Sequence, residues 1–441
     1  MARRTLIFQV VLLAVVVFLS RVPFLRNGLG TDPDAWRVAN TARSIALSGM
    51  YSYSRPPGYP FQEIFYSLMW NASPILFNAV SAIFSVVAFV FFALILSRIN
   101  CRRPIFGAMA LVFIPVVFIN STTSMDYVWA LAFILGSFYF ALDHKYVLAG
   151  VFLGLAIGCR LTSAGMILPV SILVYYQSTS RAKSIRTFLA WTIITGVALY
   201  IPVIHSYKLD FLTFYEHGYP FYLTIIKQTS LGVWGVLGSL AMLASAILLG
   251  VKFKEIKELF QARDPIFLAS ATAVAIYALI YIRLPHEAGY LIPALPFLLV
   301  ILCKVGGARW FAGVCTVLII SPMFLHLDNR QLSWSGPIFQ DRLSRIQSMQ
   351  FTAEVLYQAA QVKENSVVLA GYYLPELEWH LYKNPREHVK FIYLATREQL
   401  IELRQQGRQI YTLPQIDNYN SDIYGVNPSE YGGVQLLPSA P

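Results

Sequence analysis

The sequence predicts an α-helical polytopic membrane protein with about 11 transmembrane helices and a small C-terminal extracytoplasmic α/β domain. Of its 441 residues, 56% are hydrophobic and only 13% are charged, and the mean hydropathy is +0.56. A soluble domain carries about 25% charged residues. Apolar runs recur from residue 5 to residue 325, and ordinary soluble composition follows them.

Eleven apolar segments are predicted spans by the rule that a helix needs roughly 20 residues to cross the hydrocarbon core, although the fifth and sixth are short and nearly continuous. The first run, Leu6–Leu19, is followed by Arg21, Pro23 and Arg26 rather than by a small-residue cleavage site, which favours an uncleaved span over a signal peptide. The predicted spans are 5–25, 76–97, 104–120, 125–142, 146–159, 161–176, 187–205, 231–251, 265–282, 288–304 and 306–325.

The positions of the basic residues predict the orientation. The net charge of +11 does not indicate nucleic-acid binding, because most Lys and Arg residues lie in short loops between apolar runs. With the N-terminus inside, fifteen Lys and Arg residues fall in the short inner segments, and nine fall in the outer segments before residue 326, although those outer segments are longer. Because basic residues favour the cytoplasmic side, we expect a cytoplasmic N-terminus and an extracytoplasmic C-terminal domain.

Three regions stand out from the spans: the first outer loop (about 27–71), a second outer loop (206–230) and the soluble C-terminal domain (326–441). The transmembrane domain, 1–325, contains both loops. In the first outer loop, Ala35–Leu47 has the spacing of an amphipathic helix that lies along the membrane surface. In the C-terminal domain, Ser366–Ala370, Val389–Tyr393 and Gln409–Thr412 are predicted strands. Thr396 is placed to cap a helix that Gly407 ends.

Four scattered cysteines, at positions 101, 159, 303 and 315, form no C-x-x-C pair and accompany no histidine cluster. This pattern argues against both a zinc site and a disulfide framework.

Ionisable residues are nearly absent from the middles of the predicted spans. A proton- or ion-coupled transporter usually keeps a few of them at membrane depth. Here they collect at the outer ends of spans, which fits an active site at the membrane interface. These residues are Asp32, Asp34, Arg55, Glu63, Asp126, Arg160, His205, Arg283, His286 and Glu287.

The segment Thr31–Arg37 holds the most informative pair of carboxylates, Asp32 and Asp34. Two carboxylates at this spacing can share a divalent cation, or one can act as a base that the other tunes. Alternatively, Asp32 only caps a helix that starts at Pro33, because Asp before Pro is a common start signal.

Four motifs resemble the C-type superfamily of membrane glycosyltransferases, and most closely its protein mannosyltransferase and aminoarabinose transferase branch. The first is Asp32/Asp34 with Gly49 and Pro56-Pro57 in the first outer loop. The others are Thr123–Asp126, the Gly-rich turn Gly154–Thr162 that contains Arg160, and Arg283–Pro293. The resemblance covers about residues 1–325. It departs from the family where Pro33 separates two aspartates, since the family's acidic pair is often Asp-Glu.

The resemblance implies an inverting transfer of a sugar from a polyprenyl-phosphate donor on the outer or lumenal face of the bilayer. A carboxylate would accept the acceptor's proton, and arginines would bind the leaving phosphate. The catalytic residues would be Asp34, as the base, and Asp32, and the two could hold Mg²⁺ or Mn²⁺. The substrate-binding residues would be Asp126, Arg160, Arg283, His286 and Arg55.

Simpler interpretations remain for several of these residues. The arginines Arg160 and Arg283 could have no role beyond extending their guanidinium groups to the membrane interface. The neighbours His286 and Glu287 could be an exposed loop pair. Glu63 is expected on a polar loop surface. Gly150, Gly154 and Gly158 repeat every four residues, which favours close helix packing over a phosphate-binding loop.

Two other classes of function compete with the transferase. A transporter or flippase of lipid-linked sugars would need ionisable residues deep in several spans. A non-catalytic scaffold that displays the C-terminal domain would leave the first loop unexplained. The sequence leaves open the sugar and the acceptor, which is a lipid, a glycan or a protein.

Overall fold

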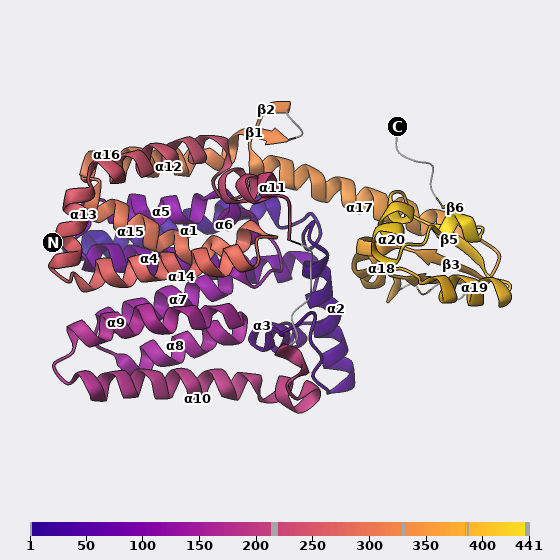
Figure 1. Cartoon of the computed structure of the whole chain (residues 1–441), viewed down its shortest axis with the longest axis horizontal. Coiled ribbons are helices and arrows are strands. Elements are labelled where there is room, and N and C mark those ends of the chain that lie inside the picture. Colours follow the sequence, from indigo (N-terminus) through magenta and orange to yellow (C-terminus); the bar gives the residue numbers. More distant parts are fainter. Residues whose placement is uncertain (1, 213–218, 329–330, 384, 386–387, 437–441) are drawn as a thin grey trace.

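The computed structural model describes residues 2–212, 219–328, 331–383, 385 and 388–436. Within this part of the chain, an apolar helix or pair of helical segments lies at each of the eleven predicted positions, and most of them run alongside one another as a bundle (Figure 1). Six are long and apolar enough to cross a membrane by length and composition, and the others are shorter. The fold class is therefore confirmed. The helices are α1 (Ala2–Arg21), α4 (Pro74–Arg98), α5 (Pro104–Phe113) with α6 (Pro115–Asn120), α7 (Tyr127–Leu142), α8 (Tyr146–Cys159), η2 (Leu161–Met166) with α9 (Ile167–Gln177), α10 (Arg181–Tyr207), α12 (Val233–Val251), α14 (Pro265–Arg283), η5 (Ala288–Ala294) with α15 (Leu295–Val305), and α16 (Ala308–Ile320).

Close approach of α8 and α10 explains the glycine repeat. A Cβ atom at Gly154 would lie 2.4 Å from the Cβ of Thr195, and one at Gly150 would lie 2.5 Å from the backbone oxygen of Phe188. Contacts this short exclude a side chain at either glycine. The packing interpretation is therefore confirmed.

The break between α5 and α6 is held by Arg21, the last residue of α1. Pro115 starts α6 and lacks the N–H that would continue the helix. The buried Arg21 guanidinium donates to the carbonyl of Val112 at the break and to Oγ of Ser121, the latter over 3.2 Å. These bonds fix the segment that leads to α7.

Helix α2 (Pro33–Ser48) crosses one end of the bundle, as Figure 1 shows. It buries Ala35, Trp36, Val38, Ala39 and Ala42 and ends at Gly49, whose φ of 68° suits glycine. The predicted helix is therefore confirmed, and its place along the membrane surface stays a prediction. The short helix α3 (Pro60–Ser67) follows it.

Beyond α16 the chain forms a hairpin, β1 (Phe324–Asp328) with β2 (Gln331–Ser335), and then the long helix α17 (Pro337–Gln361), which extends away from the bundle (Figure 1). The hairpin and α17 were not predicted. The buried guanidinium of Arg345 on α17 donates to the carbonyl of Thr122 over 2.7 Å. This bond ties α17 to the segment between α6 and α7.

The C-terminal part contains a four-stranded parallel sheet with the strand order β4-β3-β5-β6. The strands are β3 (Ser366–Leu369), β4 (Val389–Ile392), β5 (Gln409–Thr412) and β6 (Val434–Gln435), and the helices around them are α18 (Leu374–Leu381), α19 (Arg397–Gln405) and α20 (Ile416–Tyr424). Three strands and α19 lie where they were predicted, and Thr396 caps α19 through a capping box. Strand β6 was missed because it is only two residues long.

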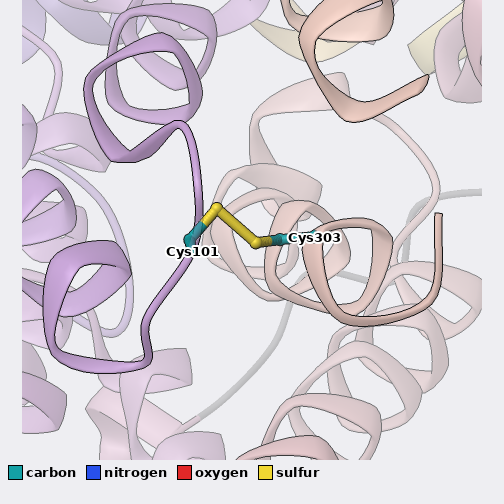
Figure 2. Close-up of a disulfide and its surroundings, with 2 residues drawn as sticks. All are labelled: Cys101 and Cys303. Carbon is teal, nitrogen blue, oxygen red and sulfur yellow. A yellow bond between two sulfur atoms is a disulfide. The ribbon is translucent and has the colours of Figure 1, made fainter. Parts of the chain in front are cut away.

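One prediction about the cysteines is wrong. Cys101, after α4, and Cys303, in α15, form a disulfide across 202 residues of sequence, with Cα atoms 6.2 Å apart (Figure 2). Packing of α15 against α5 brings the two positions together, and sequence spacing alone does not reveal such a contact. Cys159 and Cys315 are buried free thiols.

Candidate active site

Asp32 is the N-cap of α2. Its Oδ1 accepts a hydrogen bond from the backbone N–H of Asp34 over 2.8 Å, and Pro33 occupies the first helical position. The capping interpretation is therefore correct. Only Oδ1 takes part in this cap, so Oδ2 remains available for another interaction.

Asp34 lies between two arginines. Its Oδ1 is 2.9 Å from Nη1 of Arg37, one turn further along α2, and its Oδ2 is 2.9 Å from Nε of Arg55. The helix thus supplies an aspartate and an arginine, and the loop before α3 supplies the second arginine. Both oxygens of Asp34 are engaged in ion pairs.

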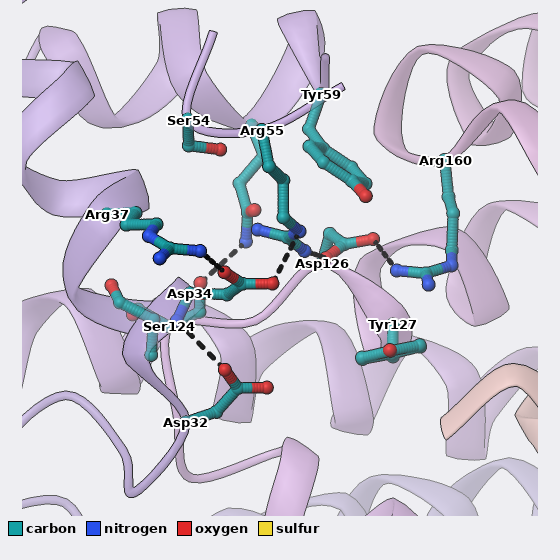
Figure 3. Close-up of polar contacts among 12 residues, drawn as sticks. Asp32, Asp34, Arg37, Ser54, Arg55, Tyr59, Ser124, Asp126, Tyr127 and Arg160 are labelled. Atoms are coloured by element: carbon teal, nitrogen blue, oxygen red, sulfur yellow. Dashed lines mark hydrogen bonds and ion pairs between the residues drawn. The ribbon is translucent and has the colours of Figure 1, made fainter. Parts of the chain in front are cut away.

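Asp126 extends this chain of ion pairs into the protein (Figure 3). It is completely buried immediately before α7. Its Oδ1 accepts from Nη2 of Arg55 over 2.8 Å, and its Oδ2 accepts from Nη1 of Arg160 over 2.6 Å. Arg160 is buried at the end of α8, so it does not simply extend to the membrane interface.

Ser124 attaches the Asp126 segment to α2. Its hydroxyl donates to the carbonyl of Ala35 over 2.8 Å, and its N–H donates to the carbonyl of Leu29 over 3.1 Å. Gln62 donates to the Ser124 carbonyl over 3.1 Å. The relative positions of Asp32, Asp34 and Asp126 are therefore fixed by backbone contacts as well as by charge.

Three tyrosines that were not predicted as site residues surround the arginines. The guanidinium carbon of Arg55 is 4.0 Å from the ring centre of Tyr59, and that of Arg160 is 3.8 Å from Tyr127 and 4.6 Å from Tyr290. Aromatic faces stabilise desolvated cations in this geometry. Each tyrosine lies in or beside a predicted motif, and that proximity could have identified it in the sequence as a site residue.

Glu287 joins the site from the loop after α14; the sequence placed it among the ionisable residues at the outer ends of spans but gave it no role in the site. Its Oε2 accepts a hydrogen bond from the Tyr127 hydroxyl. Carboxylate oxygens of Asp32, Asp34 and Glu287 all lie within 4.8 Å of one another. Glu287 therefore belongs to the carboxylate cluster rather than to an exposed loop pair.

This crowding alters the acidity of Asp32. Burial, followed by the negative charges of Glu287 and Asp34, raises the pKa of Asp32 from 3.8 to about 7. The hydrogen bond from the Asp34 N–H and the charge of Arg55 oppose that rise. Asp32 therefore changes its protonation state near neutral pH.

The prediction for Glu63 is wrong, because its side chain is completely buried rather than on a loop surface. It accepts from the N–H and hydroxyl of Ser54 over 2.7 and 2.6 Å, from the N–H of Tyr59 over 3.0 Å, and from the Tyr51 hydroxyl. Burial raises the pKa of Glu63, and these hydrogen bonds oppose the rise. The side chain holds the loop that carries Arg55 and Tyr59.

Two predicted substrate-binding residues lie outside the chain of ion pairs. The Arg283 side chain is exposed at the last residue of α14. His286 is half-buried in the following loop, next to Glu287. The structure therefore brings together Asp32, Asp34, Arg55, Asp126 and Arg160, but not Arg283.

The site offers binding groups for both an anion and a cation. Nη1 of Arg55 is buried and has no hydrogen-bond partner among the described residues. A buried unpaired guanidinium N–H is a strong donor for a phosphate oxygen. The oxygens of Asp32, Asp34 and Glu287 are the hard ligands that Mg²⁺ and Mn²⁺ prefer.

The chain matches a solved structure in fold, but comparisons of its sequence with known proteins find no match. No protein-family model matches the chain, and no curated protein matches it. Among solved structures, ArnT from Cupriavidus metallidurans in the apo state matches with a TM-score of 0.56 and 13% sequence identity. The match covers 96% of this chain and 91% of that one. The chain is therefore an integral membrane protein with the fold of the C-type glycosyltransferase superfamily.

Proposed function

We propose that this protein is an inverting glycosyltransferase that moves a sugar from a polyprenyl-phosphate donor to an acceptor at the outer face of the membrane. One observation carries the proposal. Arg55 is paired with Asp34 and Asp126, but its buried Nη1 has no partner within the described part of the chain, and the capping carboxylate of Asp32 lies beside this group of residues. A base and an anion-binding donor therefore stand at one site.

The geometry favours Asp32 as the base over Asp34, the residue that the sequence analysis preferred. Both oxygens of Asp34 are held in ion pairs by arginines, so an acceptor hydroxyl could reach this carboxylate only by displacing one of them. Asp32 uses one oxygen for the helix cap, and its pKa of about 7 suits a general base at neutral pH. In this proposal Asp34 positions Arg55.

The reaction follows from these positions. The acceptor oxygen attacks the anomeric carbon of the donor from the face opposite the phosphate, and its proton passes to Asp32. The bond between the anomeric carbon and the phosphate oxygen breaks, and polyprenyl phosphate leaves with the bonding electron pair. Nη1 of Arg55 donates to the leaving phosphate. Attack from the opposite face inverts the anomeric configuration.

In this proposal Asp126 and Arg160 hold Arg55 in place from the protein interior. Asp126 binds both guanidinium groups in a buried site. This arrangement would keep the positive charges of Arg55 and Arg160 next to the leaving group. Arg283, exposed at the end of α14, and His286, in the following loop, would form the rim of the site and meet the phosphate or the lipid chain as it arrives from the membrane.

A divalent cation, Mg²⁺ or Mn²⁺, has a supporting role in the proposal. Asp32 and Asp34, with Glu287, would hold it. Its chemistry there would be to neutralise the three carboxylates and to orient the acceptor oxygen.

The direct test uses the purified full-length protein and a panel of polyprenyl-phosphate sugars. Release of polyprenyl phosphate is measured with and without an added acceptor. We expect release that Asp32→Asn and Arg55→Ala both reduce strongly, while Arg26→Ala, at an exposed arginine near the end of the first span, leaves it unchanged. Transport of an intact donor without release of polyprenyl phosphate would instead support a flippase.

A further inference from the structure

The C-terminal sheet has a topological switch point. The chain passes from β3 to β4 on one side and then returns across β3 to β5 on the other. In open α/β sheets, ligands bind outside the carboxyl ends of the strands at such a point. Here that point is formed by the loops after β3 and β5.

Tyrosines from three segments that follow strands meet at this edge: Tyr372 in the short 3-10 helix after β3, Tyr393 just after β4, and Tyr419 in α20 after β5. We define the tyrosine cluster as Tyr372, Tyr393 and Tyr419. The hydroxyls of Tyr393 and Tyr419 are 2.8 Å apart, and the ring centres of Tyr372 and Tyr419 are 6.0 Å apart. All three side chains are half-buried. Tyr372 also donates to Oε1 of Gln415 over 3.5 Å, which connects the loop after β3 to the loop after β5.

Arg37 links the tyrosine cluster to the carboxylates of the active site. Its guanidinium pairs with Asp34 over 2.9 Å. It also lies close enough to the Tyr393 hydroxyl to oppose the rise in the pKa of that group, which burial and Tyr419 raise to about 12. A single side chain therefore separates Asp34 from the cluster.

Contacts between α18 and α2 fix this separation. Nδ2 of Asn40 donates to the carbonyl of Pro375 over 2.8 Å, and the rings of Trp36 and His380 are 5.7 Å apart. The guanidinium of Arg43 lies 4.2 Å from the ring centre of Tyr382. The tyrosine cluster is thus held at a constant distance from the helix that begins at the catalytic site.

We infer that the tyrosine cluster is an acceptor subsite that binds the carbohydrate part of a glycan acceptor. This inference rests on the proposed glycosyltransferase function. The C–H face of a sugar ring packs on the electron-rich face of an aromatic ring, and tyrosine hydroxyls exchange hydrogen bonds with sugar hydroxyls. An oligosaccharide that lies across Arg37 would place one terminal hydroxyl next to the carboxylates while its following residues rest on the tyrosines.

A glycan fits these contacts better than a peptide. Extended peptides are commonly recognised by hydrogen bonds to an exposed strand edge, whereas the cluster consists of side chains beyond the carboxyl ends of β3, β4 and β5. Its hydroxyls are neutral, and the nearby charge of Arg37 is already paired with Asp34. A mostly neutral, hydroxyl-rich ligand matches this surface.

The test compares acceptors in the full-length protein. The probes are trisaccharides of mannose, galactose or glucose, a Ser/Thr peptide, and water, with release of polyprenyl phosphate as the readout. The variants are Tyr372→Ala and Tyr419→Phe, with Tyr357→Ala on α17 as a matched control at an exposed tyrosine. Tyr372→Phe keeps the ring and serves as the conservative variant. Melting temperatures establish that each variant is folded.

We expect Tyr372→Ala to raise the KM for the trisaccharide roughly tenfold, the loss of about one aromatic contact. Its kcat and its release of polyprenyl phosphate to water should stay unchanged. Tyr372→Phe should recover most of the affinity, and Tyr357→Ala should have no effect. An unchanged trisaccharide KM in folded Tyr372→Ala, or use of the peptide alone, would overturn the inference.

Failure of the proposed function gives a different result. In that case no donor is turned over, even to water, by any variant. Trisaccharide binding measured calorimetrically without donor still tests the subsite, because it requires no transfer. Binding that is lost in Tyr372→Ala and kept in Tyr357→Ala supports the subsite, and no binding to the parent protein contradicts it.

Discussion

Arg55 and Asp126 lie 71 residues apart in the sequence, yet Nη2 of Arg55 donates to Oδ1 of Asp126 over 2.8 Å in the buried interior. Arg55 comes from the segment between α2 and α3 and Asp126 from the approach to α7. Their contact makes one site out of two membrane loops. It also holds a guanidinium whose remaining Nη1 has no partner among the described residues.

The first prediction concerns this guanidinium. Arg55→Ala removes the donor to the leaving phosphate, a charge-assisted hydrogen bond worth about 1.5–3 kcal/mol. We expect donor turnover to fall by roughly ten- to hundredfold. Arg55→Lys should recover only part of the rate, because an ammonium cannot bind Asp34, Asp126 and phosphate in one plane. Steady-state release of polyprenyl phosphate measures the change.

The rim residue Arg283 and the exposed Arg26 give the comparison. Arg283→Ala should reduce turnover less than Arg55→Ala, and Arg26→Ala should not reduce it. If Arg283→Ala is the more damaging substitution, the phosphate binds at the rim and not at Arg55.

The second prediction concerns pH. Because burial and neighbouring charges raise the pKa of Asp32 to about 7, the carboxyl is protonated below that pH and cannot accept a proton. Transfer in the presence of EDTA should therefore rise with pH, with a midpoint near 7. Bound Mn²⁺ should move the midpoint down, because a cation favours the ionised carboxylate.

Glu287→Gln provides the control for this pH profile. It removes one of the negative charges that raise the pKa of Asp32, so the EDTA midpoint should fall, and Mn²⁺ binding measured by electron paramagnetic resonance should weaken. A midpoint near 4 in the parent protein would contradict the described environment of Asp32.

The third prediction concerns orientation. Cysteines introduced at the exposed positions Ser48 and Ser335 should react with an impermeant thiol reagent from outside the cell, and one at Ser180 should not. The reason is the excess of Lys and Arg in the inner segments. Ser48 is preferable to Ser54, whose hydroxyl binds Glu63. Labelling of Ser180 and Ser335 from the same side would contradict the predicted topology.

The fourth prediction concerns Glu63. Glu63→Ala leaves the N–H groups of Ser54 and Tyr59 without their acceptor, and an unsatisfied buried polar group costs about 1–3 kcal/mol. We expect a lower melting temperature and a reduced rate, since the Arg55 loop loses its support. Glu63→Gln keeps an acceptor oxygen and should recover most of the stability. Equal melting temperatures for Glu63→Ala and the parent would show that this loop is held in another way.

Some of this architecture could be predicted from the sequence because it is encoded locally. Hydropathy located the eleven helical positions, Asp32 before Pro33 signalled a helix cap, and Thr396 signalled the start of α19. Each of these signals depends on residues within one helix or one turn.

Other features depend on which distant segments pack together. Glu287 lies in the carboxylate cluster only because the loop after α14 reaches the start of α2. Cys101 meets Cys303 only because α15 packs on α5. Glu63 is buried only because residues 51–59 fold over it. An acid in a loop looks the same in sequence whether it is exposed or enclosed by backbone donors.

The most direct test of the central claim is the rate of polyprenyl phosphate release by Asp32→Asn. Asn caps a helix about as well as Asp, so the variant should keep the parent's melting temperature while its rate falls on the order of a hundredfold or more. Asp34→Asn, measured alongside, should lose less because it affects the position of Arg55 rather than the base. A folded Asp32→Asn protein that releases polyprenyl phosphate at the parent's rate would contradict the claim, and loss of activity in Asp34→Asn alone would make Asp34 the base.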